Sequence, residues 1–121
     1  MLQVKSMVVG IVGTNCYIVY DKKSRDAVII DPGAEAERIL SFLEEEELHP
    51  QAILLTHGHF DHILAVPALR GKYKIPLYAA EEERKMLGNG QLNMSGRDPE
   101  DNVEIQDFTA LRDGEELEFL G

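Results

Sequence analysis

The sequence is poor in residues that cross-link a chain or anchor it in a membrane. It contains one cysteine, Cys16, and no tryptophan. A single cysteine cannot form an internal disulfide, and we interpret Cys16, which lies in an apolar stretch, as a small core residue rather than a redox group. No run approaches the roughly 18 apolar residues of a membrane span. Gln3 and Lys5 interrupt the stretch that a secretory signal would need, so we expect a cytoplasmic protein.

Cationic residues are also scarce. The chain has 12 Lys and Arg against 22 Asp and Glu, for a net charge of -10. This balance repels phosphate backbones and anionic lipid surfaces, so we expect neither nucleic acid nor a membrane as a partner. The length of 121 residues, with 44% hydrophobic content, predicts one domain over residues 1–121.

The first half of the chain alternates between strand and helix patterns. β-branched residues and breakers predict a hairpin and then a strand–helix–strand unit, in which the helix stops at His49-Pro50. Such a unit pairs parallel strands, and ligand sites favour the carboxyl ends of these strands. The predicted strands cover residues 4–9, 15–20, 27–30 and 51–55, with the helix over residues 34 to about 46.

The second half carries weaker patterns. We expect a helix from about Val66-Pro67, where proline suits a first helical position. A short strand over residues 75–79 and a charged helix over residues 81–87 follow. Residues 88–102 are rich in breakers and predict a long loop, and a last strand is expected over residues 117–120.

Three of the four histidines gather directly after the strand predicted at residues 51–55. His57 and His59 lie two residues apart, so in an extended loop both can grip one cation. Asp61 and His62 follow where the chain turns, and they can serve a second ion nearby. The alternative for each residue alone is structural: Asp61 can cap a turn, and the histidines can be ordinary surface or packing residues. Four ligand-type residues in one short segment favour the metal site.

This segment, Thr56-His57-Gly58-His59-Phe60-Asp61-His62, resembles the HxHxDH signature of the metallo-β-lactamase superfamily. The resemblance extends to Thr14-Asn15-Cys16-Tyr17, Ile30-Asp31-Pro32-Gly33 and Asp113-Gly114-Glu115, in the family's order. Within the superfamily, these segments resemble those of members like hydroxyacylglutathione hydrolase (glyoxalase II). The resemblance implies an α+β fold, the αββα sandwich, of which this chain would form mainly the N-terminal sheet with its helices.

The resemblance also implies a site and an activity. His57 and His59 would bind a first zinc ion, and Asp61 and His62 a second, with Asp61 also orienting the nucleophile. Asp31 would support the metal loop from behind without contacting metal, although a turn-forming role before Pro32 is equally in keeping with its position. The implied reaction is hydrolysis of a thioester or related small acyl substrate by a metal-bound hydroxide. Iron or manganese in place of zinc, and an iron-dependent persulfide dioxygenase, are the alternatives.

One departure from the family pattern bears on completeness. The family's later ligands, namely a histidine in a Gly-His-Thr segment, a bridging aspartate and a final histidine, have no counterpart, because no histidine follows His62. We therefore expect a truncated domain, part of a longer hydrolase. The alternative is a non-catalytic metal-binding half-domain. Either way, a missing half, a second copy or a partner would cover the sheet face left open.

Overall fold

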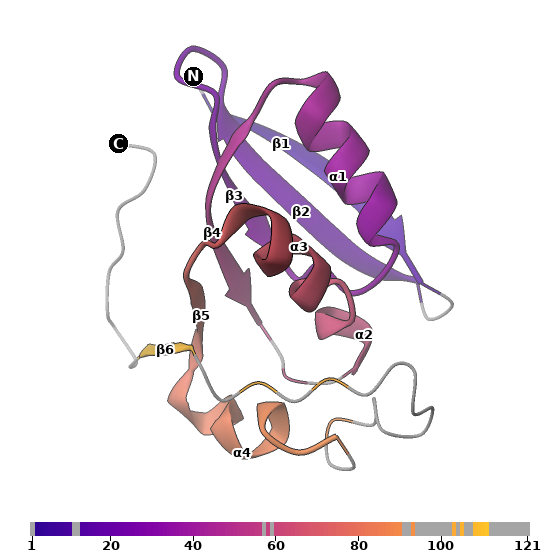
Figure 1. The fold of residues 1–121 in the computed structure, drawn as a ribbon, viewed down its shortest axis with the longest axis vertical. Coiled ribbons are helices and arrows are strands. Elements are labelled where there is room, and N and C mark those ends of the chain that lie inside the picture. The colour runs from indigo at the N-terminus through magenta and orange to yellow at the C-terminus, as the bar shows by residue number, and fades with distance from the viewer. Residues whose placement is uncertain are drawn as a thin grey trace.

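A six-stranded mixed sheet with helices packed on one face organises the chain (Figure 1). The computed structural model describes residues 2–10, 13–56, 58, 60–90, 93, 103, 105 and 108–111. Within these residues the strands are ordered β1-β2-β3-β4-β5-β6, so each strand pairs with its neighbour in sequence. β1 and β2 pair antiparallel, as do β2 and β3, whereas β3 to β6 pair in parallel. The predicted α+β class follows from this arrangement.

The predicted hairpin is confirmed. β1 (Leu2–Val9) pairs with β2 (Thr14–Asp21), and the register brings Val9 opposite Thr14. The turn between them needs Gly10 and Gly13, which have φ values of 75° and 76°, in the left-handed region that favours glycine. The amide of Gly13 closes the turn on the carbonyl of Gly10 at 3.3 Å.

The predicted strand–helix–strand unit is also confirmed, with different boundaries. β3 (Asp26–Ile30) leads through α1 (Ala36–Glu45) to β4 (His49–Leu55). The prediction that His49-Pro50 stops the helix is wrong, because α1 ends at Glu45 and both residues belong to β4. A register shift opposite Ala27 and Val28 accommodates Pro50, which cannot donate a ladder hydrogen bond.

The remaining elements are short. A four-residue helix, α2 (Phe60–Ile63), precedes α3 (Val66–Tyr73), whose start matches the prediction. After β5 (Leu77–Ala80), the predicted helix over residues 81–87 forms as a 3₁₀ turn, η1 (Glu81–Glu83), followed by α4 (Arg84–Leu87). β6 (Thr109–Leu111) was not predicted. The strand predicted over residues 117–120 and most of the predicted loop 88–102 lie outside the described residues. In the described part of the chain, no helix has the length and apolarity to cross a membrane.

The core lies between the sheet and the helices α1 and α3 (Figure 1). Alternate residues of β1, β2 and β5 point into it, as Cys16 and Ile18 of β2 do, and these two are fully buried. The opposite face of the hairpin is apolar yet open to solvent. Its exposed large side chains are Leu2, Val4, Val8 and Tyr17, with exposures of 54%, 62%, 57% and 37%.

Candidate metal centre

The predicted site lies at the carboxyl ends of the neighbouring parallel strands β3 and β4. Asp31 directly follows β3, and its amide donates to the carbonyl of Leu54 at 3.0 Å. Thr56 directly follows β4, and α2 with Asp61 and His62 begins four residues later. The position expected from the strand–helix–strand unit is therefore the one that the structure has.

Asp31 is the centre of this arrangement. Only 4% of its surface is exposed, and its φ of 52° lies in the left-handed region, which aspartate tolerates better than most residues. Oδ1 accepts the amide of Thr56 at 2.7 Å, and Oδ2 accepts the Thr56 hydroxyl. Oδ2 also lies 3.1 Å from Nδ1 of His62. One buried carboxylate thus joins the end of β3 to the end of β4 and to α2.

Asp61 and His62 face each other on α2. Oδ2 of Asp61 lies 3.4 Å from Nε2 of His62, and the two side chains are 22% and 18% exposed. Two atoms bound at about 2.1 Å to one tetrahedral ion lie about 3.4 Å apart, so this pair has the spacing of two ligands of a single zinc ion. Nδ1 faces Asp31 and Nε2 faces Asp61, so a metal ion bound by Asp61 would meet Nε2, as in carboxylate–histidine–zinc arrangements. The donor pair therefore fits a divalent cation.

The backbone of α2 is fixed by the turn after β3. A Cβ added at Gly33 would lie 1.8 Å from the carbonyl oxygen of Asp61, so only glycine allows this approach. The carbonyl of Gly33 accepts the amide of Leu64 at 3.2 Å, and that of Pro32 accepts the amide of Ala65 at 3.0 Å. The turn therefore anchors the segment that carries Asp61 and His62.

Side chains from other elements reach the predicted metal loop. The hydroxyl of Thr14, the first residue of β2, donates to Oδ2 of Asp61 at 2.8 Å. The amide of Gly58 donates to Oε1 of Glu83, in η1, at 2.7 Å. Leu87 of α4 packs close to Gly58, because a Cβ added there would meet its side chain at 3.2 Å. Sequence patterns did not single out Thr14 or Glu83 for the site, since their contacts span 47 and 25 residues.

Two of the four predicted metal ligands, Asp61 and His62, are among the residues that the structure describes. His57 and His59 lie outside the described residues, whereas Asp31, Asp61 and His62 come together. No group of three or more His, Cys, Asp or Glu side chains is arranged to hold a metal ion among the residues that the structure describes. A zinc site that contains Asp61 and His62 therefore needs further ligands, and His57 and His59 are those that the sequence predicts.

Cys16 matches the interpretation as a core residue. Its side chain is fully buried within β2. Burial raises the pKa of the thiol from 9.0 to about 12, with a smaller contribution from the charge of Asp31. The thiol is therefore protonated over the physiological pH range and is a poor nucleophile.

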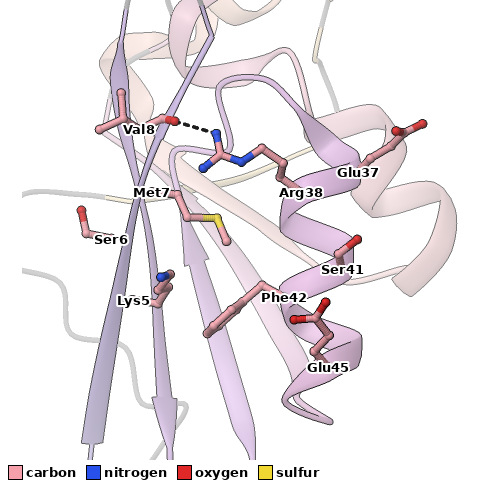
Figure 2. Close-up of a pocket in the computed structure, with 9 residues that line it drawn as sticks. All are labelled: Lys5, Ser6, Met7, Val8, Glu37, Arg38, Ser41, Phe42 and Glu45. Carbon is pink, nitrogen blue, oxygen red and sulfur yellow. Dashed lines mark hydrogen bonds between the residues drawn. The ribbon is translucent and has the colours of Figure 1, made fainter.

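A groove of about 560 Å³ lies between β1 and α1 (Figure 2). Arg38 reaches across it from α1 and donates to the carbonyl of Val8 at 2.9 Å, as the dashed line in Figure 2 marks. Nζ of Lys5 lies 5.7 Å from the ring centroid of Phe42. None of the predicted site residues lines this groove, so it is separate from the candidate metal centre.

Comparison with known sequences identifies the family to which the chain is similar. The family model described as the metallo-beta-lactamase superfamily matches residues 9–120. The chain is 40% identical over 92 residues to the probable metallo-hydrolase YqgX of Bacillus subtilis, covering 76% of this chain and 43% of that protein. It is 40% identical over 73 residues to the hydroxyacylglutathione hydrolase GloC of Haemophilus influenzae, covering 60% of this chain and 34% of that protein. The chain thus spans less than half of the length of these two curated relatives.

Solved structures agree. The BLEG-1 B3 metallo-beta-lactamase superposes with a TM-score of 0.85 at 38% identity, over 97% of this chain and 56% of that chain. TTHA1623, solved in a di-iron-bound form, superposes with a TM-score of 0.77 at 28% identity, over 93% of this chain and 56% of that chain. The predicted fold class, α+β and metallo-β-lactamase-like, is confirmed. The chain belongs to the metallo-beta-lactamase superfamily.

Proposed function

We propose that the protein is a metal-dependent hydrolase of a thioester or related small acyl substrate. The observation that carries this proposal is the series of contacts from Asp31 to His62 to Asp61, with spacings of 3.1 Å and 3.4 Å. It presents one imidazole nitrogen and one carboxylate oxygen at the separation of two ligands of one ion. The similarity to a hydroxyacylglutathione hydrolase supports a thioester as the substrate class.

The residues that would hold the metal follow from the same geometry and from the sequence motif. We assign Asp61 and His62 to one zinc ion and His57 and His59 to a second, with Asp31 orienting His62. When bound, such ions lower the pKa of a water molecule to near neutrality and polarise an acyl carbonyl. Asp61 would then have a second role, as the carboxylate that orients the attacking water. Thr56 contributes by holding Asp31, through two hydrogen bonds, in the position that faces His62.

Chain outside these 121 residues would complete the site in this proposal. The sequence contains four histidines, of which His62 is the last, whereas a catalytic zinc ion takes three protein ligands. The matched region corresponds to 43% of YqgX and 56% of BLEG-1, so such relatives have room for further ligands. The same additional chain, or a second copy, would cover the apolar face formed by Leu2, Val4, Val8 and Tyr17.

The test uses the full-length protein and two histidine variants. The wild type is expected to bind about two zinc ions by elemental analysis and to hydrolyse an S-acylglutathione. His59→Ala should lower the zinc content and reduce the rate by about a hundredfold or more. His49→Ala is the matched control, because His49 is exposed at the start of β4, away from the site, and should behave as wild type. A wild-type protein that holds no metal would refute the proposal.

Two alternatives predict different outcomes of the same measurements. The first alternative is an iron-dependent persulfide dioxygenase, and the di-iron form of TTHA1623 is the observation that favours iron as the metal. A purified protein that contains iron and consumes oxygen while it oxidises a persulfide would favour this alternative over the hydrolase. Zinc bound without turnover of any acyl substrate would favour a non-catalytic metal-binding module. We further propose a cytoplasmic protein, in keeping with its single cysteine. The net charge of -10 supports the proposal that it binds neither nucleic acid nor membranes.

A further inference from the structure

We propose that Thr14 is a positioning residue for the proposed metal ligand Asp61. Its hydroxyl donates to Oδ2 of Asp61 at 2.8 Å. The same oxygen lies 3.4 Å from Nε2 of His62 and is the one that would bind the metal in the proposed function. This inference rests on that function, and it adds a contact from β2 to a site otherwise built on the ends of β3 and β4.

The carboxylate of Asp61 needs such a contact. The last torsion of an aspartate side chain is broad, so the backbone alone does not fix the plane of the carboxylate or the direction in which its oxygens point. Asp61 also lies on α2, which has only four residues. An isolated helix of this length would not be stable, so its side chains depend on tertiary contacts for their orientation. A donor fixed in another element selects one rotation of the carboxylate.

Thr14 is suited to this role because it is itself held firmly. It is the first residue of β2 and pairs with Val9 across the hairpin, directly after Gly13 in its left-handed conformation. Its side chain is β-branched, which restricts its first torsion, and only 8% of the residue is exposed. The hydroxyl of Thr14 is therefore held in one position relative to Asp61.

The backbone and the carboxylate of Asp61 are fixed from different sides. Gly33 lies against the carbonyl oxygen of Asp61 so closely that an added Cβ would be 1.8 Å away, and it thereby sets the position of the backbone. The hydroxyl of Thr14 sets the orientation of the carboxylate. A hydrogen bond to an ionised carboxylate is stronger than one between neutral groups, and such supporting contacts typically change metal affinity by about 10-fold to 100-fold.

The test compares zinc affinity in variants of the full-length protein. Thr14→Val keeps the shape of the side chain but removes the donor, Thr14→Ser keeps the donor, and Thr109→Val is the matched control on the exposed edge of β6. Competition with a chromophoric chelator gives the dissociation constant for Zn²⁺, and the melting temperature of the metal-free protein reports on folding. We expect Thr14→Val to weaken binding about 10-fold to 100-fold, while the other two stay within about threefold of wild type.

Several results would overturn the inference. Zinc affinity of Thr14→Val within about threefold of wild type would show that the hydroxyl does not position Asp61. Equal losses in Thr14→Val and Thr14→Ser would show that side-chain shape, rather than the hydrogen bond, matters. If Thr14→Val does not fold, Thr14→Ala and Thr14→Ser, which differ by one oxygen atom, give the same comparison. A wild-type protein without zinc affinity would refute the proposed function itself, and the inference with it.

Discussion

Oδ2 of Asp31 lies 3.1 Å from Nδ1 of His62, while the other ring nitrogen of His62 lies 3.4 Å from Oδ2 of Asp61. Asp31 and His62 are far apart in the sequence, yet the turn after β3 brings them together. Asp31 also accepts the amide and the hydroxyl of Thr56. A buried carboxylate with three such neighbours couples the stability of the sheet edge to the orientation of a proposed metal ligand.

Replacing Asp31 should therefore affect stability and zinc affinity together. Asp31→Ala removes the buried carboxylate that accepts the amide and the hydroxyl of Thr56, and we expect a loss of about 2 to 4 kcal/mol in the free energy of unfolding, because hydrogen bonds to a charged group are stronger than those between neutral groups. Asp31→Asn retains one acceptor oxygen and tolerates the left-handed backbone, so its loss should be smaller. Urea denaturation measures the stability and chelator competition the affinity for Zn²⁺.

The control for Asp31 is Asp26→Ala, at the other end of β3, where the carboxylate accepts from the side chain of Gln51 near the surface. This variant should stay within about 0.5 kcal/mol of wild type. Unchanged zinc affinity in Asp31→Ala would contradict the role assigned to Asp31. It would instead favour the alternative from the sequence, a purely turn-forming aspartate before Pro32.

Gly33 and Gly71 make a matched pair of glycine substitutions. A Cβ at Gly33 would lie 1.8 Å from the carbonyl oxygen of Asp61, whereas one at Gly71 meets nothing within 4 Å. Gly33→Ala must push α2 away from the turn and should cost about 2 to 3 kcal/mol of stability. Gly71→Ala, inside α3, should instead gain about 0.5 to 1 kcal/mol. Thermal unfolding distinguishes the two, and equal effects would contradict this account of the turn.

Glu83 should hold the middle of the histidine motif through the amide of Gly58. Glu83→Ala removes the acceptor found at 2.7 Å, and Glu83→Gln keeps an oxygen at the same position. We expect Glu83→Ala to lose about 1.4 kcal/mol of local protection at the amide of Gly58, which corresponds to roughly tenfold faster hydrogen exchange there. Nuclear magnetic resonance reads the exchange of Gly58 directly. Glu82→Ala, at the exposed neighbouring position, should leave it unchanged, and faster exchange in both variants would argue against a specific contact.

Elements with a strong local pattern were predictable from the sequence. β1 to β5 and α1 have runs of β-branched residues or a helical apolar stripe, and their boundaries differ from the structure by only a few residues. The placement of Asp31 beside the histidine motif also agrees with the structure, because both follow neighbouring parallel strands. Its proposed role in metal binding stays a prediction.

Elements and contacts fixed by tertiary structure were not predictable in this way. β6 has three residues and exists through parallel pairing with β5, so no periodicity marks it. α2 has four residues and depends on the turn at Gly33. The hydroxyl of Thr14 reaches Asp61 across 47 positions, and nothing in the neighbouring residues signals such a contact. These parts of the site are specified by how the elements pack.

Cys16 gives a prediction about alkaline pH. The pKa of its thiol is about 12 in the folded protein, against an ordinary value of 9.0, because the side chain is buried and lies near the charge of Asp31. In the unfolded chain the thiol loses its proton from about pH 9, while the folded protein retains it. The unfolded state then binds fewer protons, so the free energy of unfolding falls as pH rises between these two values.

The slope from one such group is about 1.4 kcal/mol per pH unit. Tyrosines and lysines titrate in the same range, so the informative quantity is the difference between wild type and Cys16→Ala in urea denaturation at about pH 8 to 11. Below about pH 9 the variant should be less stable, because Ala leaves a cavity at a fully buried position. The deficit should shrink as pH rises, since only the wild type has the thiol. A difference in the free energy of unfolding that stays constant from about pH 8 to 11 would mean that Cys16 ionises alike in the folded and unfolded states. In a separate experiment, rapid alkylation of the folded protein at about pH 8 would mean that the thiol is not buried.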